Sequence, residues 1–247
     1  VPPEIDFDLT EILVEREAIT VICSEKGWIR AMKGHLELGT EFKYKEGDGP
    51  GFILHAETTD KILLFAENGR FYTLTGDKLP RGRGFGEPVS LMIDLPVDID
   101  IVRLMRANGK KLLVAASTGH GLIVETEVAL AQTRSGKQVL NVPGDSRAVA
   151  CCSVEGDMIA SVGVNRKMLV FPVAEVPEMI RGRGVILQRF KDGGLADVTV
   201  YSAEAGLSWK AGGGRTRTEA DMSDWLGKRA GAGKMPPTGF PRPARFT

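Results

Sequence analysis

The chain has 247 residues, of which 43% are hydrophobic, 26% charged and 6% aromatic, the composition of a globular protein with one large or two small domains. It contains no apolar run near the roughly 20 residues that cross a bilayer, and no recognisable signal peptide, which disfavours membrane-spanning and secreted classes. Because it begins at Val1 rather than Met, we expect it to be part of a longer protein.

The formal net charge is zero, but acidic and basic residues are separated along the chain. Residues 1–60 contain 13 acidic and 6 basic side chains, whereas residues 161–247 contain 14 basic and 8 acidic ones. A neutral protein with its charges separated in this way can still present a basic face to a polyanion.

Residues 1–18 are acidic and open with two prolines, which predicts a connector with a short helical turn around Leu9–Glu15. From Ile19 onward, one pattern occurs five times: an apolar run, a turn of Gly, Asn, Ser or Glu, and a second apolar run. This pattern is typical of a β-hairpin of buried strands. The five copies are 19–32, 61–74, 111–125, 157–173 and 197–211.

The copies begin 40 to 50 residues apart, a period that predicts an all-β, propeller-like array of about five blades over residues 19–240. No copy carries a Trp-Asp ending or a double glycine before its strands, so the common propeller families do not fit. The last residues, 241–247, are predicted to be a flexible tail.

A glycine-containing basic loop follows each predicted hairpin, at 32–49, 79–89, 130–142, 176–190 and 223–237. In a radial array, equivalent loops of successive blades fall along one rim, where their cations can follow a bent phosphate backbone. Glycine lets such a loop turn sharply, and arginine matches phosphate oxygens. The candidate DNA-contacting residues are Arg81, Arg83, Lys137, Arg181, Arg183, Lys228 and Arg229.

Several long phrases resemble the C-terminal domain of the A subunit of bacterial type IIA topoisomerases, and topoisomerase IV (ParC) more than gyrase. They are SEKGWIRAMKGH (24–35), NGRFYTL (68–74), LPRGRGFGEPV (79–89), RSGKQVLNV (134–142) and MLVFPVAEVPEMIRGRG (168–184). The resemblance implies a β-pinwheel, in which propeller-like blades exchange strands. Gyrase carries a Gln-Arg-Arg-Gly-Gly-Arg-Gly box, whereas residues 80–86 here lack the Gln and the adjacent arginines, so strong wrapping is not implied.

By this resemblance, the domain would bind and bend duplex DNA without reading its sequence. It would present a transport segment for decatenation and supercoil relaxation during chromosome segregation. Its partners in a heterotetramer would be the ATPase (B) subunit and the catalytic core of its own polypeptide, in the bacterial cytoplasm at the nucleoid. ATP and Mg would be used by other domains, and we expect no cofactor, metal or catalytic residue here and a monomeric isolated domain.

Other functions have weaker support in the sequence. The three histidines share no ligand spacing with Cys, Asp or Glu, and the three cysteines show no CxxC pattern, which is typical of buried thiols in a reducing cytoplasm. No GxSxG elbow or complete phosphate-binding loop is present. The alternatives are a gyrase-type DNA-wrapping domain and a propeller-like module that binds protein through its acidic N-terminal third; a propeller hydrolase would need a carboxylate or histidine cluster.

Overall fold

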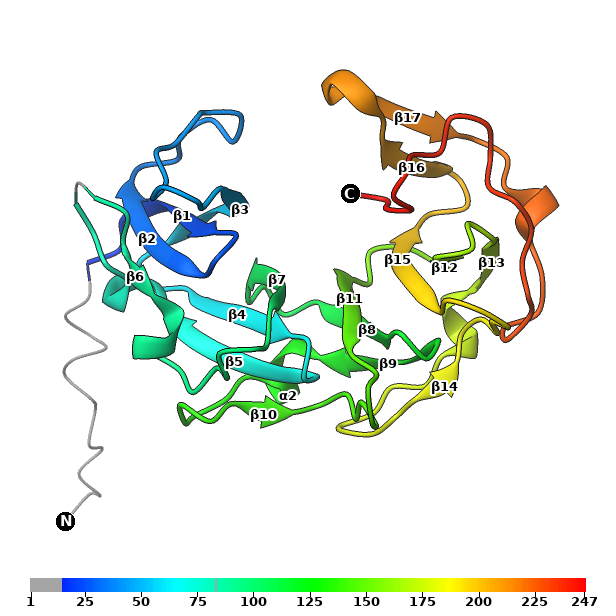
Figure 1. The fold of residues 1–247 in the computed structure, drawn as a ribbon, viewed down its shortest axis with the longest axis horizontal. Coiled ribbons are helices and arrows are strands. Elements are labelled where there is room, and N and C mark those ends of the chain that lie inside the picture. The colour runs from blue at the N-terminus through cyan, green and yellow to red at the C-terminus, as the bar shows by residue number, and fades with distance from the viewer. Residues whose placement is uncertain (1–14, 83) are drawn as a thin grey trace, which may run out of the picture.

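The computed structural model describes residues 15–82 and 84–247 and contains four of the predicted hairpins (Figure 1). Most of the connector predicted at 1–18 therefore lies outside the described residues. In each hairpin two antiparallel strands are joined by a tight turn. They are β1 (Ala18–Ser24) with β2 (Trp28–Lys33), β4 (Lys61–Ala66) with β5 (Arg70–Thr75), β8 (Lys111–Ala116) with β9 (His120–Glu125), and β12 (Met158–Gly163) with β13 (Met168–Pro172).

A third strand pairs with the first strand of each hairpin, on the side away from the second strand. These inner strands are β3 (Pro50–Glu57), β7 (Ile101–Arg106), β11 (Ala148–Ser153) and β15 (Leu195–Tyr201). The prediction of a fifth hairpin at 197–211 is therefore wrong, since β15 completes the fourth sheet by pairing with β12. The fifth sheet is built instead from β16 (Leu207–Lys210) and β17 (Thr216–Glu219).

Neighbouring blades exchange short strands. The strands β6 (Glu87–Pro88), β10 (Lys137–Gln138) and β14 (Val185–Ile186) pair with β2, β5 and β9, each of which belongs to the preceding hairpin. The one α-helix among the described residues, α2 (Thr126–Ala129), is a single turn that leads out of β9. This exchange is the β-pinwheel arrangement that the family resemblance implies.

Each hairpin is buried on both faces, which explains why its strands are continuous apolar runs. Ile62 and Leu64 of β4 pack against the first blade, whereas Leu63 and Phe65, which point to the opposite face, pack against the third. The same alternation continues through β8 and β12. Four successive hydrophobic cores therefore join five sheets in a row.

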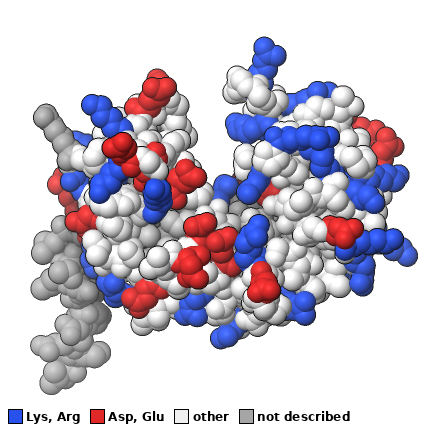
Figure 2. Space-filling view, in the orientation of Figure 1, with Lys and Arg blue, Asp and Glu red and all other residues white. Residues whose placement is uncertain are grey.

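The five sheets form an open arc, a property that the sequence left undecided. Figure 1 shows β1–β3 at one end and β16–β17 at the other, separated by an opening that is also visible in the space-filling view of Figure 2. The exchanged strands β6, β10 and β14 lie on the outer side of the arc, and β7, β11 and β15 lie on its inner side (Figure 1). Among the described residues, no helix is long and apolar enough to cross a bilayer.

The C-terminal segment differs from its prediction as a flexible tail at 241–247. Phe246 and Ala244 are buried in the core of the fifth blade beside Trp209. The amide of Lys210 on β16 donates to the Phe246 carbonyl at 3.1 Å, and the amide of Phe246 donates to Asp197 Oδ2 at 2.9 Å. The segment thus takes the place next to β16 that β15 takes next to β12, so it completes the last blade.

Candidate nucleic-acid interface

Four of the predicted basic loops return to the preceding hairpin and cover the edge of its second strand. We call them rim loops 1 to 4: residues 79–89, 130–142, 176–190 and 223–237. Bridges join Arg81 to Ala31, Lys137 to Phe71, Glu178 to Ile123 and Leu226 to Val170. The loop at 32–49 is different, since it folds back over its own blade, where Arg30 donates to the Lys43 carbonyl.

One glycine occupies the same place in every rim loop, immediately before the exchanged segment. These glycines are Gly86, Gly136, Gly184 and Gly233, with φ between +70° and +83°. A Cβ at these positions would lie 1.9 to 2.6 Å from a carbonyl oxygen of the covered strand. Only glycine combines this backbone conformation with so close an approach, so the four loops are held on their strands in one register.

Rim loop 1 contains two of the predicted DNA-contacting residues. Arg81 is partly exposed, and its Nη1 lies 3.1 Å from Glu17 Oε2. Arg83 lies outside the described residues. The Arg81 guanidinium is thus available at the surface but shares its charge with a carboxylate from the start of the described chain.

Rim loops 2 and 3 contain three more of these residues. Lys137 is half-buried on β10, whereas Arg181 and Arg183 are exposed. Arg181 Nε donates to Asn141 Oδ1 at 3.4 Å, and this hydrogen bond joins rim loop 3 to rim loop 2. Neither Arg181 nor Arg183 has an acidic partner among the described residues.

Rim loop 4 contains the last two. Lys228 is exposed, but Arg229 is half-buried and its Nη1 donates to the Ile186 carbonyl at 2.7 Å, so part of its hydrogen-bonding capacity fastens rim loop 4 to rim loop 3. Figure 2 shows Lys and Arg side chains spaced along the lower and right-hand outer edge of the arc, with Asp and Glu between them. The predicted cations among the described residues therefore lie on loops that cover equivalent edges of successive sheets.

Two arginines near the rim were not singled out from the sequence. Arg134, within the RSGK phrase, is exposed and lies 3.4 Å from Asp94. Arg70, at the turn between β4 and β5, donates to the Ser135 carbonyl from Nε at 2.9 Å and from Nη2 at 2.7 Å. Arg70 follows Asn68-Gly69 in a hairpin turn, and no local pattern indicates that it holds a loop 65 residues away.

Arg30 is buried on β2 and, like Arg70, holds a rim loop in place, in this case rim loop 1. Its guanidinium donates to the carbonyls of Gly84 and, at 2.8 Å, Lys43, and it lies 6.0 Å from the ring centroids of Phe42 and Tyr44. A buried charge without hydrogen bonds is costly, and here backbone oxygens and aromatic faces satisfy it. The positive charge therefore also contributes to the potential beneath the loop.

The pKa of His120 on β9 depends on the positive charge of rim loop 3. Burial lowers the pKa of His120, and the positive charges of Arg183 and Arg189 lower it further. Its Nδ1 lies 3.0 Å from Thr118 Oγ1.

The remaining histidines and the thiols have structural surroundings. The rings of His35 and His55 stack at 4.6 Å and contact backbone carbonyl oxygens. Burial raises the pKa of Cys23 and of Cys152 to about 12. Across residues 15–82 and 84–247, no three His, Cys, Asp or Glu side chains are grouped as a metal site would need.

Comparisons with known proteins agree with the resemblance seen in the sequence. No family model matches the chain. It is 47% identical over 246 residues to the A subunit of DNA topoisomerase 4 from Caulobacter vibrioides, covering 99% of this chain and 32% of that protein. It is 44% identical over 240 residues to the protein of the same name from Rickettsia bellii, with 97% and 32% coverage. The chain thus spans about a third of the length of these relatives.

Solved structures share the fold. The E. coli ParC C-terminal domain superposes with a TM-score of 0.77 at 24% identity, covering 90% of this chain and 95% of that one. A DNA gyrase A C-terminal domain gives 0.63 at 18% identity, covering 88% and 76%. Together with the exchanged strands, these matches show that the chain is similar in sequence to about a third of the A subunit of DNA topoisomerase 4, and that it shares the β-pinwheel fold of the ParC C-terminal domain.

Proposed function

We propose that the domain binds and bends duplex DNA along rim loops 1 to 4, through phosphates rather than bases. The observation that carries this proposal is the recurrence of cations on loops held in one register on successive sheets. Phosphate contacts fix the position of a protein on DNA without reading sequence. The arc of sheets (Figure 1) supports a curved path for the phosphate backbone of DNA.

Several loops must act together in this proposal. Smoothly bending a site of 20–30 bp by 40–90° costs about 1–6 kcal/mol, so contacts to one loop alone would not sustain a bend. Arg81, Arg181, Arg183 and Lys228 are the described cations best exposed for phosphates, and Lys137 and Arg229 are half-buried. Arg83, which lies outside the described residues, is included in the proposal because it belongs to the RGRG sequence of rim loop 1.

In the parent enzyme, the domain would present a transport segment to the catalytic core and so favour decatenation and relaxation of supercoils during chromosome segregation. The ATPase subunit would be its partner in a heterotetramer, together with the core of its own polypeptide, and ATP and Mg would be used on those other domains. The setting would be the bacterial cytoplasm at the nucleoid. These roles rest on the kinship with the A subunit of topoisomerase 4.

The decisive experiment is a gel-shift titration of the 247-residue chain on a duplex of about 30 bp at two salt concentrations. Arg181→Ala combined with Arg183→Ala should weaken binding on any sequence and reduce the salt slope by roughly one unit per contact. Arg215→Ala, just before β17, combined with Arg217→Ala within it is the control of equal charge, because both residues lie outside the rim loops. Equal losses in both variants would mean nonspecific attraction, and unchanged binding in the rim variant would reject the proposed path.

A topological assay separates bending from gyrase-type wrapping. Closure of nicked circles in the presence of the domain leaves a linking-number change only where DNA is wrapped with one handedness. Because residues 80–86 lack the Gln and the adjacent arginines of the gyrase box, we expect little change. A large change of constant sign would favour the gyrase-type alternative.

A further inference from the structure

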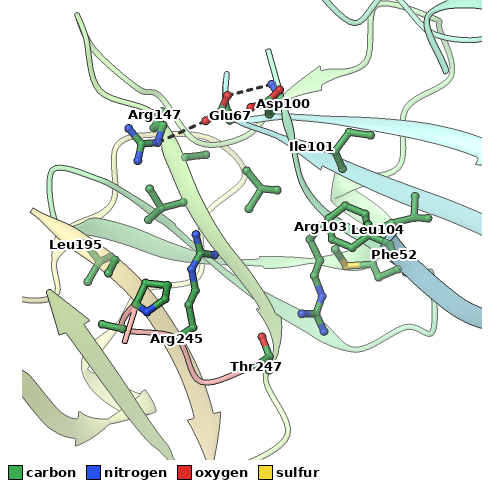
Figure 3. Close-up of a pocket in the computed structure, with 18 of the residues that line it drawn as sticks. Phe52, Glu67, Asp100, Ile101, Arg103, Leu104, Arg147, Leu195, Arg245 and Thr247 are labelled. Carbon is green, nitrogen blue, oxygen red and sulfur yellow. Dashed lines mark hydrogen bonds and ion pairs between the residues drawn. The ribbon is translucent and has the colours of Figure 1, made fainter. Parts of the chain in front are cut away.

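A cavity of about 1120 Å³ occupies the inner side of the arc, away from the rim loops. It is lined by residues of β3, β7, β11 and β15 and by the C-terminal segment from Arg242 to Thr247. The inner strands of four blades and the end of the fifth thus surround one space, part of which is drawn in Figure 3.

Strand β7 presents its edge to this cavity. All six of its residues, Ile101 to Arg106, line the space, although side chains alternate between the two faces of a strand. Consecutive residues can line one cavity only where the strand edge faces it. β7 is the last strand of its sheet, and the edge opposite β4 has no backbone partner among the described residues. Such an edge can pair with another extended chain.

The cavity is strongly basic. Its lining contains Arg103, Arg106, Arg147, Arg166, Arg242 and Arg245 against two carboxylates, Glu67 and Asp100. Glu67 lies 3.4 Å from Arg147, and Arg106 is 3.9 Å from Asp60. Within the described part of the chain, the side chains of Arg103, Arg242 and Arg245 make no hydrogen bond or ion pair. The cavity therefore holds more guanidinium groups than its own acidic residues can neutralise.

Two of these arginines line the cavity from different parts of the chain. Arg103 extends from β7 and Arg245 from the C-terminal segment, and Figure 3 shows them on either side of Thr247. Burial raises the pKa of the Asp197 carboxyl, while amides of Phe246 and Val198 and the charges of Arg245 and Arg103 oppose that shift. Both guanidiniums thus favour the charged form of the same carboxyl group.

Apolar side chains share the lining with the arginines. Phe52 and Leu54 of β3 and Met105 of β7 are half-buried there. A free strand edge between cationic and apolar side chains fits an extended polypeptide whose acidic and apolar residues alternate, because a strand sends successive side chains to opposite sides. The sugar–phosphate backbone of a nucleic acid has no amide groups with which to pair a strand edge.

We propose that this cavity binds an extended acidic segment of a protein partner as a strand added to β7, with its carboxylates on Arg103 and Arg245. Guanidinium and carboxylate form paired hydrogen bonds, and the backbone of the added strand pairs with β7. The site is distinct from the rim loops, so peptide and duplex DNA can be bound together.

The test uses fluorescence anisotropy of a labelled ten-residue peptide in which Glu and Val alternate, titrated with the 247-residue chain. Arg103→Gln combined with Arg245→Gln should weaken peptide binding at least tenfold and leave duplex affinity within twofold. The rim variant with Arg181→Ala and Arg183→Ala should do the reverse. If the double variant does not fold, Arg245→Gln alone decides, since Arg245 is exposed.

A second peptide, N-methylated at every other amide, separates strand addition from simple charge attraction. It keeps every carboxylate but loses amides that pair with β7, and it should bind at least tenfold more weakly. Equal binding of the two peptides, equal binding by the arginine variants, or no binding by the unmodified chain would overturn the proposal. Displacement of the peptide by pyrophosphate or by a short duplex would overturn it in favour of a phosphate site.

Discussion

At the scale of single residues, the pKa of His120 can be used to test whether DNA binds at rim loop 3. Its pKa is lowered first by burial and then by Arg183 and Arg189. Bound phosphates would offset those positive charges, and a nearby negative charge favours the protonated ring. We therefore expect the pKa of His120 to rise when duplex DNA is added, as measured by NMR titration of its ring protons at low salt.

The matched variant is Arg183→Ala, which should also raise the pKa of His120 in the free protein and reduce the further rise on adding DNA. His35, which hydrogen-bonds to the Ala56 carbonyl on the first blade, serves as the internal control. A pKa of His120 that stays constant at saturating DNA would remove rim loop 3 from the proposed path.

The rim-loop glycines allow strain and steric overlap to be separated. Gly184 has a φ of +79°, and a Cβ there would lie 1.9 Å from the Gly121 oxygen of β9. Gly109 has nearly the same φ, +75°, with open space around it. Gly109→Ala should cost only the left-handed backbone penalty, about 1–2 kcal/mol. Gly184→Ala should cost about 1–3 kcal/mol more through overpacking, in urea unfolding. Equal costs would mean that rim loop 3 is not pressed onto β9.

At the scale of elements, the C-terminal segment acts as the inner strand of the fifth blade. Phe246 packs edge-on against Phe240, which in turn packs edge-on against the buried Trp209. Phe246→Ala should therefore destabilise the protein by about 3–5 kcal/mol and alter the near-ultraviolet signal of the aromatic residues. Val97→Ala, at a fully exposed position, should change stability by less than about 0.5 kcal/mol. If Phe246→Ala changes stability by no more than Val97→Ala, the prediction of a flexible tail at 241–247 would be favoured instead.

The elements that the sequence predicts well are those with strong local signals. Apolar runs around Asn68-Gly69 or Gly119 identify hairpins because turn chemistry and strand burial agree within one short stretch. The exchanged strands have only two residues each, too few for any periodicity. Their register is fixed by contacts to a hairpin far back in the chain, as with Gly184 against Gly121. Ala244 and Phe246 are spaced as alternate residues of a strand are. Because arginines and prolines surround them, however, the stretch is typical of a polar tail.

At the scale of the whole molecule, the candidate site is a property of the array. Each rim loop contributes few exposed cations, and none has a shape that would specify a ligand alone. The repeat places these loops on one edge of successive sheets, and the open arc (Figure 1) determines how their positions follow one another. The recurrence of RGRG and RSGK marks the positions of these loops in the sequence. The opening between the first and last blades could not, because it depends on how each sheet packs on the next.

The array predicts how DNA binding depends on duplex length. A duplex much shorter than about 20 bp can reach few of the four rim loops, whereas a site of about 20–30 bp can bend along all of them. The dependence of log K on log salt should therefore steepen up to about that length and then level off, since each neutralised phosphate adds about 0.9 to the slope. Arg181→Ala combined with Arg183→Ala should flatten the slope only for duplexes long enough to reach rim loop 3. A slope that is the same for all lengths would place binding on one compact patch, and the arc would then have no part in guiding DNA.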